Sequence, residues 1–266
     1  MSRNLKNIAR LIDVANEKTS IEEAFLSDLK RSIELTAKKE SRPPSQTYKP
    51  SSMNCIRGMY YQVMGKDVKD DANYTNIGIC NSGSDIHERI QQAVIDMKSN
   101  GMDCEYINVA EFVRDRDLQD IDIVQEPDFE NGQYETKLYN KKYNISFLCD
   151  GIIRYKGKYF ILELKTEASF KWQSRCGVDL KHYKQGIAYS LNLGLNDVIF
   201  VYINRDVLDM KSYMFHVDDV MRQELVDLIT ECQGYVDRQI PPPKPEDLPK
   251  NACKYCGYKE ICDGDK

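Results

Sequence analysis

Two apolar segments on either side of Lys156-Gly157 constrain the fold of this chain more than any other feature. Residues 143–155 (YNISFLCDGIIRY) and 158–165 (KYFILELK) are rich in β-branched and aromatic residues, which favour β-strands. The glycine between them readily adopts the positive φ that a two-residue hairpin turn requires. The pattern therefore predicts a β-hairpin whose turn is this dipeptide.

The predicted hairpin brings two carboxylates together. A two-residue turn pairs Tyr155 with Lys158. The same register places Asp150 directly opposite Glu163, with their β-carbons about 4.5–5.5 Å apart. Two facing carboxylates destabilise a sheet unless a positive charge lies between them, and a divalent cation satisfies both. The hairpin therefore predicts a site for Mg²⁺ or Mn²⁺.

A lysine completes this predicted site. Strand alternation places Lys165 on the same face as Glu163. Metal-assisted phosphodiester hydrolysis needs hard oxygen ligands together with a cation beside the attacked phosphate, and Lys165 would orient the nucleophile or stabilise the transition state. The alternative for these residues is a surface hairpin with an ordinary salt-bridged Asp, Glu and Lys.

A helix with a histidine is expected upstream of the hairpin. Ser84 is its candidate N-cap, and an apolar face follows at helical spacing. The members of that face are Ile86, Ile90, Val94 and Met97. His87 lies at the edge of this face and is predicted to look across at the sheet. Its alternative role is that of a hydrogen-bonded core residue.

A second helix is expected downstream, over residues 179–194, where it ends at a glycine. His182, Gln185 and Tyr189 have the spacing i, i+3 and i+7, so they share one face of this helix. For His182 the alternative is a solvated surface position.

Together these residues resemble a known family. Asp150 with Glu163-Leu164-Lys165 resembles the PD-(D/E)XK nuclease signature, and the flanking segments resemble its RecB-like branch. The resemblance implies a metal ion held by His87, Asp150, Glu163 and the backbone carbonyl of Leu164. It also implies that Lys165 is the catalytic cation, with Asp150 and Glu163 in the catalytic set.

The downstream helix adds to the resemblance. Gln185-x-x-x-Tyr189 is similar to the family's Q-x-x-x-Y motif, and His182 matches the version in CRISPR-associated adaptation exonucleases; AddB-type nuclease domains are also similar. The resemblance implies that Gln185 and Tyr189 contact the DNA backbone or shape the active site. His182, Trp172 and Arg57 complete the predicted DNA-binding set.

The first residues carry scattered charges without an apolar core, and no segment has the roughly 18 apolar residues of a membrane span. A cytoplasmic protein without a membrane partner is therefore expected.

Cysteine spacing is the second independent signal. Nine cysteines in a reducing compartment favour metal binding over disulfides. Cys253, Cys256 and Cys262 cluster near the C-terminus, which leaves a tetrahedral or cubane site one ligand short.

The fourth ligand is implied by the family resemblance. Cys55-Ile56-Arg57 resembles the Cys-Pro-Arg segment that carries the first cluster cysteine in iron-sulfur RecB-like nucleases, with Ile56 in place of the proline. The resemblance implies a 4Fe-4S cluster that joins the N-terminal part of the core to the C-terminal tail. Zinc is the alternative cofactor at these thiolates. Other cysteines could replace Cys55 as the fourth ligand: Cys80, Cys104, Cys176 and Cys232.

The element order predicts an α/β fold with a mixed central sheet flanked by helices, as in restriction-endonuclease-like cores. Residues 197–204 (DVIFVYIN) form a further buried strand and residues 218–236 a long closing helix. The predicted organisation is an N-terminal helical extension (1–46), a nuclease core (47–240) and a C-terminal iron-sulfur tail (241–266).

Net charge and the position of aromatic residues indicate which form of DNA the chain would bind. The net charge of −5 argues against a protein that coats duplex DNA through bulk positive charge. Phe170 and Trp172 lie among lysines and arginines near the predicted site, where they would stack single-stranded bases or anchor a loop. There is no Gly-x4-Gly-Lys-Ser/Thr segment for a P-loop motor.

The sequence thus predicts a standalone metal-dependent DNA exonuclease that acts on single-stranded ends. Two alternatives stay open at this point. One is a partner-dependent structure-specific or CRISPR-adaptation nuclease. The other is an inactive module of the same fold that binds DNA or a protein.

Overall fold

The computed structural model describes residues 21–38, 43–68, 73–246, 248, 252–254 and 256–265. The chain forms two compact units, one of residues 1–43 with 70–81 and the other of residues 44–69 with 82–266. In the first unit, residues 21–38 form the predicted helix, and Glu34 on it accepts a hydrogen bond from the backbone N–H of Tyr74 at 3.0 Å. Residues 1–20 of the predicted extension lie outside the described residues.

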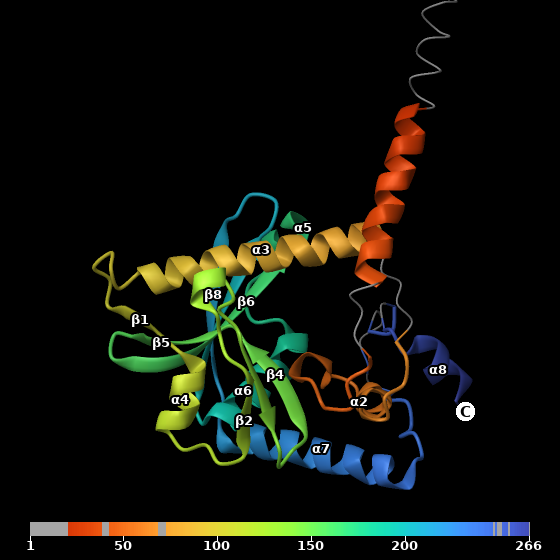
Figure 1. The fold of residues 1–266 in the computed structure, drawn as a ribbon. Coiled ribbons are helices and arrows are strands. Elements are labelled where there is room, and N and C mark those ends of the chain that lie inside the picture. The colour runs from red at the N-terminus through yellow and green to blue at the C-terminus, as the bar shows by residue number, and fades with distance from the viewer. Residues whose placement is uncertain are drawn as a thin grey trace, which may run out of the picture. The chain divides into compact units, whose positions relative to one another are not determined.

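The second unit is built on a five-stranded mixed sheet with strand order β1-β5-β6-β7-β8 (Figure 1). Only the β6–β7 pair is parallel among the pairs of this sheet. The strands are β1 (Cys104–Ile107), β5 (Gly151–Tyr155), β6 (Lys158–Glu167), β7 (Asp197–Asn204) and β8 (Met210–His216). The predicted α/β fold with a mixed central sheet is confirmed.

A smaller antiparallel sheet has the order β2-β3-β4. Its strands are β2 (Ile121–Gln125), β3 (Thr136–Asn140) and β4 (Ile145–Cys149). β3 pairs with β4 in a register that opposes Thr136 to Cys149. The residues that precede Thr136 and follow Cys149 therefore leave this sheet side by side.

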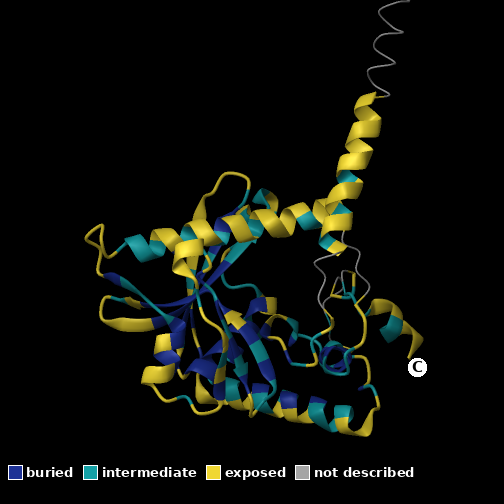
Figure 2. Cartoon of the chain, viewed as in Figure 1, coloured by how far each residue is buried: buried dark blue, intermediate teal, exposed yellow. Residues whose placement is uncertain are grey.

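Helices cover both faces of the five-stranded sheet. On one face, Ile86 of α3 (Tyr74–Asp96) packs in a cluster with Leu162 and Leu164, and Ile90, Val94 and Met97 extend that contact as predicted. The other face packs against α6 (Leu180–Leu193) and α7 (Asp219–Arg238). Figure 2 shows that the buried residues concentrate in the strands between these helices.

Short helices complete the second unit. They are η1 (Pro50–Ser52), α2 (Ile56–Val63), α4 (Val109–Asp115), η2 (Phe129–Asn131), α5 (Ser169–Gln173) and α8 (Lys259–Gly264). None of the described helices is long and apolar enough to cross a membrane.

The hairpin has the predicted turn and register. Lys156 and Gly157 both have positive φ, 48° and 78°, and Tyr155 pairs with Lys158. The paired residues continue to Gly151 opposite Leu162, one step before the two carboxylates. The turn chemistry was therefore sufficient to set the register.

The first arm of the hairpin differs from the prediction. A single strand over residues 143–155 is wrong, because the chain passes from β4 in the small sheet to β5 in the large sheet at Asp150. Gly151 permits this passage, since a β-carbon there would lie 2.5 Å from the Tyr106 ring. Asp150 thus lies where the two sheets meet.

The start of α3 also differs. Ser84 as an N-cap is wrong, because the helix already begins at Tyr74 and continues through Gly83 and Ser84. Gly83 lies close over β6, where a β-carbon would be 3.2 Å from the Thr166 hydroxyl. A glycine that resembles a helix start in the sequence instead provides close packing of helix on sheet.

The later elements match the predictions. β7 has the predicted bounds, α6 begins after the capping side chain of Asp179, and it ends at Gly194 with φ 67°. α7 follows Asp218, whose carboxylate accepts a hydrogen bond from the Met221 amide. Caps and a long apolar run are local signals, which explains why these elements were predictable.

Candidate active site

Asp150 is held rigidly at the junction of the two sheets. The residue is 5% exposed, and Oδ2 accepts a hydrogen bond of 2.6 Å from the backbone amide of Leu164. Its carbonyl oxygen lies 2.7 Å from the Gln91 side-chain amide and 3.0 Å from the Tyr106 hydroxyl. These contacts leave Oδ1 directed toward α3, 3.8 Å from Nδ1 of His87.

Glu163 has one occupied and one free oxygen. Its Oε1 accepts from Nζ of Lys165 at 2.5 Å and from the side-chain amide of Gln185 at 2.7 Å. Its Oε2 is buried and has no hydrogen-bond partner. A buried anionic oxygen without a partner is costly, and a cation would satisfy it.

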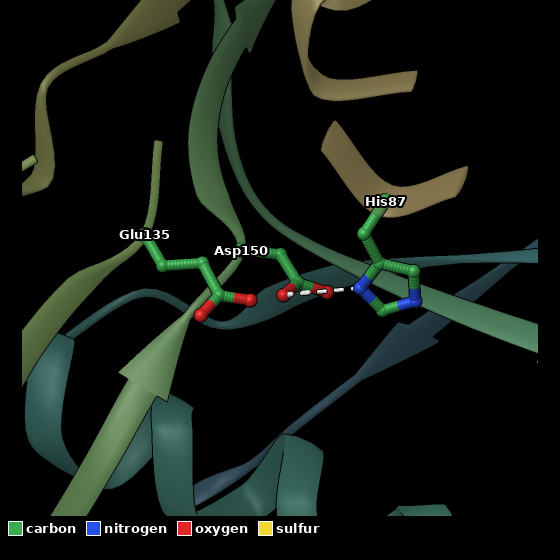
Figure 3. Close-up of side chains that lie close together, drawn as sticks. All are labelled: His87, Glu135 and Asp150. Carbon is green, nitrogen blue, oxygen red and sulfur yellow. Dashed lines mark ion pairs between the residues drawn. The ribbon is translucent and has the colours of Figure 1, made fainter. Parts of the chain in front are cut away.

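The structure adds a carboxylate that the sequence analysis missed. Glu135 directly precedes β3. One of its carboxylate oxygens lies within 4.8 Å of a carboxylate oxygen of Asp150 and of a ring nitrogen of His87 (Figure 3). Figure 3 shows Asp150 between the other two side chains. The signal that could have revealed Glu135 was the pairing of β3 with β4, because the step before Thr136–Cys149 brings Glu135 beside Asp150.

Burial and mutual repulsion set the protonation of these acids. Burial, followed by the charge of Asp150, raises the pKa of Glu163 to about 8 and that of Glu135 to about 7. Burial also disfavours ionised Asp150, but its contact with His87 and the Leu164 amide outweigh burial and lower its pKa. For His87, burial is outweighed by the carboxylates, chiefly that of Asp150, and the pKa is raised. Ionising all three acids would therefore place more negative charge in the site than His87 and Lys165 balance, and protons replace the missing cation near neutral pH.

The Q-x-x-x-Y residues, Gln185 and Tyr189, form a chain of hydrogen bonds that begins at Glu163. The Gln185 amide donates to Glu163 and contacts the Tyr189 hydroxyl at 2.8 Å, and that hydroxyl donates to the Leu148 carbonyl at 2.8 Å. Gln185 and Tyr189 are buried, at 6% and 4% exposure. Gln185 thus contacts Glu163 directly, and Tyr189 contacts Gln185.

His182 is buried on the same helix face. Its Nδ1 lies 2.9 Å from the Tyr202 hydroxyl, and its ring stacks on Phe200 and Tyr202. Burial, with the charges of Lys165 and Lys181, lowers the pKa of His182 to about 3. The surface alternative for His182 is therefore wrong, and the imidazole is neutral at physiological pH.

Two further predicted DNA contacts have partners within the protein. The Trp172 indole donates to the Tyr202 carbonyl at 2.9 Å. The Arg57 side chain is 7% exposed and donates to the carbonyl oxygens of Cys262 at 3.2 Å and Asp265 at 2.5 Å. Arg57 thus attaches the C-terminal segment to α2. DNA contact by Trp172 and Arg57 stays a prediction.

Four cysteines far apart in the sequence line one pocket. Cys55 precedes α2, and the three tail cysteines lie across from it, with Tyr61 and Lys244 also in the lining. The tail members are Cys253, Cys256 and Cys262. The proposed substitutes for Cys55 lie elsewhere: Cys104 and Cys232 are buried in apolar clusters, and Cys80 and Cys176 are exposed. The pocket therefore contains the ligand set implied by the resemblance.

Two solved structures are similar to this chain at low sequence identity. No protein-family model and no curated protein matches the chain. A solved structure titled "Crystal structure of SSO0001" is 16% identical over 91% of this chain and 98% of that chain, with a TM-score of 0.46. An alkaline exonuclease (LHK-Exo) from Laribacter hongkongensis is 10% identical over 74% of this chain and 90% of its own, with a TM-score of 0.45.

Proposed function

We propose that this chain is a metal-dependent nuclease. The observation that carries the proposal is the buried Oε2 of Glu163, which has no hydrogen-bond partner although Asp150 and Lys165 lie beside it. Buried carboxylate oxygens in this state are typical of ligands for hard divalent cations such as Mg²⁺ and Mn²⁺. In an inactive domain that only binds DNA or a protein, the same buried oxygens would destabilise the fold without a function.

The proposed roles follow from the contacts. Asp150, Glu163 and the Leu164 carbonyl would hold a divalent ion. The Leu164 N–H donates to Asp150. Because the N–H and C=O of one strand residue point to the same edge of the strand, the Leu164 carbonyl also faces Asp150. A bound ion would acidify water and neutralise phosphoryl oxygens. Lys165 would orient the attacking water or stabilise the charge that develops on phosphate. Gln185 would keep the ligand geometry of Glu163.

The proposed substrate is DNA, with cleavage from single-stranded ends. Phe170 on α5 is 80% exposed, and Lys171 follows it in the chain. Exposed aromatic side chains near cations stack unpaired bases without sequence preference. The acidic net charge of −5 disfavours broad electrostatic binding to duplex DNA.

The proposed cofactor of the cysteine pocket is a 4Fe-4S cluster. Four cysteines line this pocket: Cys55, Cys253, Cys256 and Cys262. The choice of iron-sulfur over zinc follows the resemblance of Cys55-Ile56-Arg57 to the segment that carries the first cluster cysteine in iron-sulfur RecB-like nucleases.

The test is hydrolysis of end-labelled linear single-stranded DNA beside a circular strand, with Mg²⁺ or Mn²⁺. We expect the wild type to degrade the linear strand only, and Glu163→Gln to have no detectable activity. Glu130→Gln, an exposed glutamate on η2, is the matched control and should be unchanged. Cleavage of the circle would replace exonuclease by endonuclease activity, and equal cleavage by Glu163→Gln would overturn the proposed site.

A further inference from the structure

One face of the helix over residues 21–38 is apolar and exposed to solvent. Its members recur at helical spacing on one side of the helix: Ile21, Phe25, Leu26, Leu29 and Ile33. Ile21 and Phe25 are 71% and 67% exposed, and Leu29 is 45% exposed. Figure 2 shows most of this helix in the colour of exposed residues. Single exposed apolar side chains are ordinary, whereas a contiguous group of them marks an interaction site.

The helix makes its contacts with the start of α3 through a different side. Lys30 Nζ lies 4.6 Å from the centre of the Tyr74 ring, and the Glu34 carboxylate accepts from the Tyr74 amide at 3.0 Å. At about 100° per residue, Lys30 and Glu34 lie roughly 100° and 140° from Leu29 around the helix axis. The charged side of the helix therefore meets the start of α3, while the apolar face takes no part in these contacts.

Charge along this helix is divided between its two halves. The acidic residues of the first half, over residues 21–29, are Glu22, Glu23 and Asp28, and this half has no basic residue. The basic residues of the second half, over residues 30–38, are Lys30, Arg31 and Lys38, and Glu34 is its one acid. Two antiparallel copies of the helix bring the acidic half of each copy opposite the basic half of the other. Two parallel copies would bring like charges together, and such charge pairs decide the orientation of paired helices.

We propose that the apolar face of helix 21–38 binds the same face of a second copy of this chain, with the two helices antiparallel. The inference does not depend on the nuclease function. Apolar burial would provide the affinity, and the divided charge would provide the orientation. Because a helix about 27 Å long offers a small interface, the dimer should dissociate on dilution. A membrane surface fits less well, since helices that lie in membranes carry mainly lysine and arginine on their polar side.

The test is sedimentation equilibrium of the full-length chain over about 1 to 100 μM, the range of micromolar affinity. We expect the wild type to exchange reversibly between monomer and dimer. Leu29→Gln, in the middle of the apolar face, should weaken the dimer about tenfold or more. Leu35→Gln is the matched control and should dimerise as the wild type does, because Leu35 is exposed on the same helix but about 120° from Leu29. Circular dichroism and thermal unfolding check that each variant is folded.

A charge-reversal experiment tests the orientation. One chain carries Glu23→Lys with Asp28→Lys, and the other carries Arg31→Glu with Lys38→Glu. Each chain alone should dimerise less than the wild type at low salt, because an antiparallel pair would then place like charges together. An equimolar mixture should form a heterodimer, since opposite charges meet again.

Four outcomes would overturn the proposal. A wild-type chain that stays monomeric at every concentration has no such dimer. Equal dimerisation by Leu29→Gln and the wild type would exclude the apolar face. A monomeric wild type whose melting temperature falls in Leu29→Gln would assign this face to a contact within one chain. Charge-reversed chains that each dimerise as tightly as the wild type, with no preference for the mixture, would contradict the antiparallel arrangement.

Discussion

The two ligand-rich regions of this molecule are built in opposite ways. The oxygen site, formed by His87, Glu135, Asp150 and Glu163, is carried by paired strands and a helix packed on them. The cysteine pocket joins the start of α2 to a tail whose one described helix, α8, has six residues. The first region is positioned by the fold before any ion binds, whereas the proposed cluster would add to the Arg57 contacts that attach the tail. Changes in the oxygen site should therefore affect chemistry, and changes in the cysteine pocket should affect stability.

The largest expected effect is on chemistry in the oxygen site. Lys165→Met should lower the cleavage rate about 100- to 1,000-fold, because it removes the cation beside the phosphate. The melting temperature should change little, since the Lys165 partner Glu163 can be neutralised by a proton. Single-turnover cleavage with saturating Mn²⁺ measures this effect. Lys158→Met, on the exposed first residue of β6, is the control; a rate for Lys165→Met within tenfold of the wild type would contradict the assigned role.

The next effect is on stability in the cysteine pocket. Cys256→Ser should lose iron and acid-labile sulfide, and its tail should become sensitive to limited proteolysis, because one of the cluster ligands is gone. Cys176→Ser, at an exposed cysteine outside the pocket, should behave as wild type. Anaerobic purification followed by iron and sulfide analysis checks the prediction. Equal behaviour of the two variants would contradict the stabilising role of the cysteine pocket. Stoichiometric zinc without sulfide would mean that the pocket binds zinc and not an iron-sulfur cluster.

A smaller effect is expected from the contact that attaches the tail. Arg57→Met removes the donors to the Cys262 and Asp265 carbonyls and should cost about 1–3 kcal/mol in the free energy of unfolding. Arg154→Met breaks an exposed ion pair with Glu105 and should cost less than Arg57→Met, because solvent screens the pair. Urea unfolding of the two variants measures the difference. A cost for Arg57→Met no greater than that for Arg154→Met would mean that the tail contact is dispensable.

A pH dependence of the metal-free protein is also expected. Folding raises the pKa of Glu135 to about 7 and that of Glu163 to about 8, from 4.5. Acids raised in this way contribute stability below pH 4.5, and that contribution is lost as the pH rises through 7 and 8. With a chelator present, the melting temperature should therefore fall between pH 5 and pH 9, and Mn²⁺ should reverse the fall. Glu163→Gln should flatten the profile, and a profile as steep as wild type would contradict the pKa assignment.

Local chemistry in the sequence determined much of this structure. The Lys156-Gly157 turn specified the hairpin register, and the caps at Asp179 and Gly194 specified α6. Both depend on hydrogen bonds and φ values within a few residues, so one sequence contains all of the information. The Asp150 and Glu163 pair followed from that register.

Only the tertiary structure decided how the site is completed. The break of the strand at Asp150 depends on the Tyr106 ring against Gly151, a contact between segments about 45 positions apart. The position of Glu135 beside Asp150 depends on the pairing of β3 with β4 and on the contact between Tyr134 and Gln92. The pocket likewise brings Cys55 together with tail cysteines that lie far from it in the sequence. Such contacts are chosen by packing over long sequence separations, which local propensity does not encode.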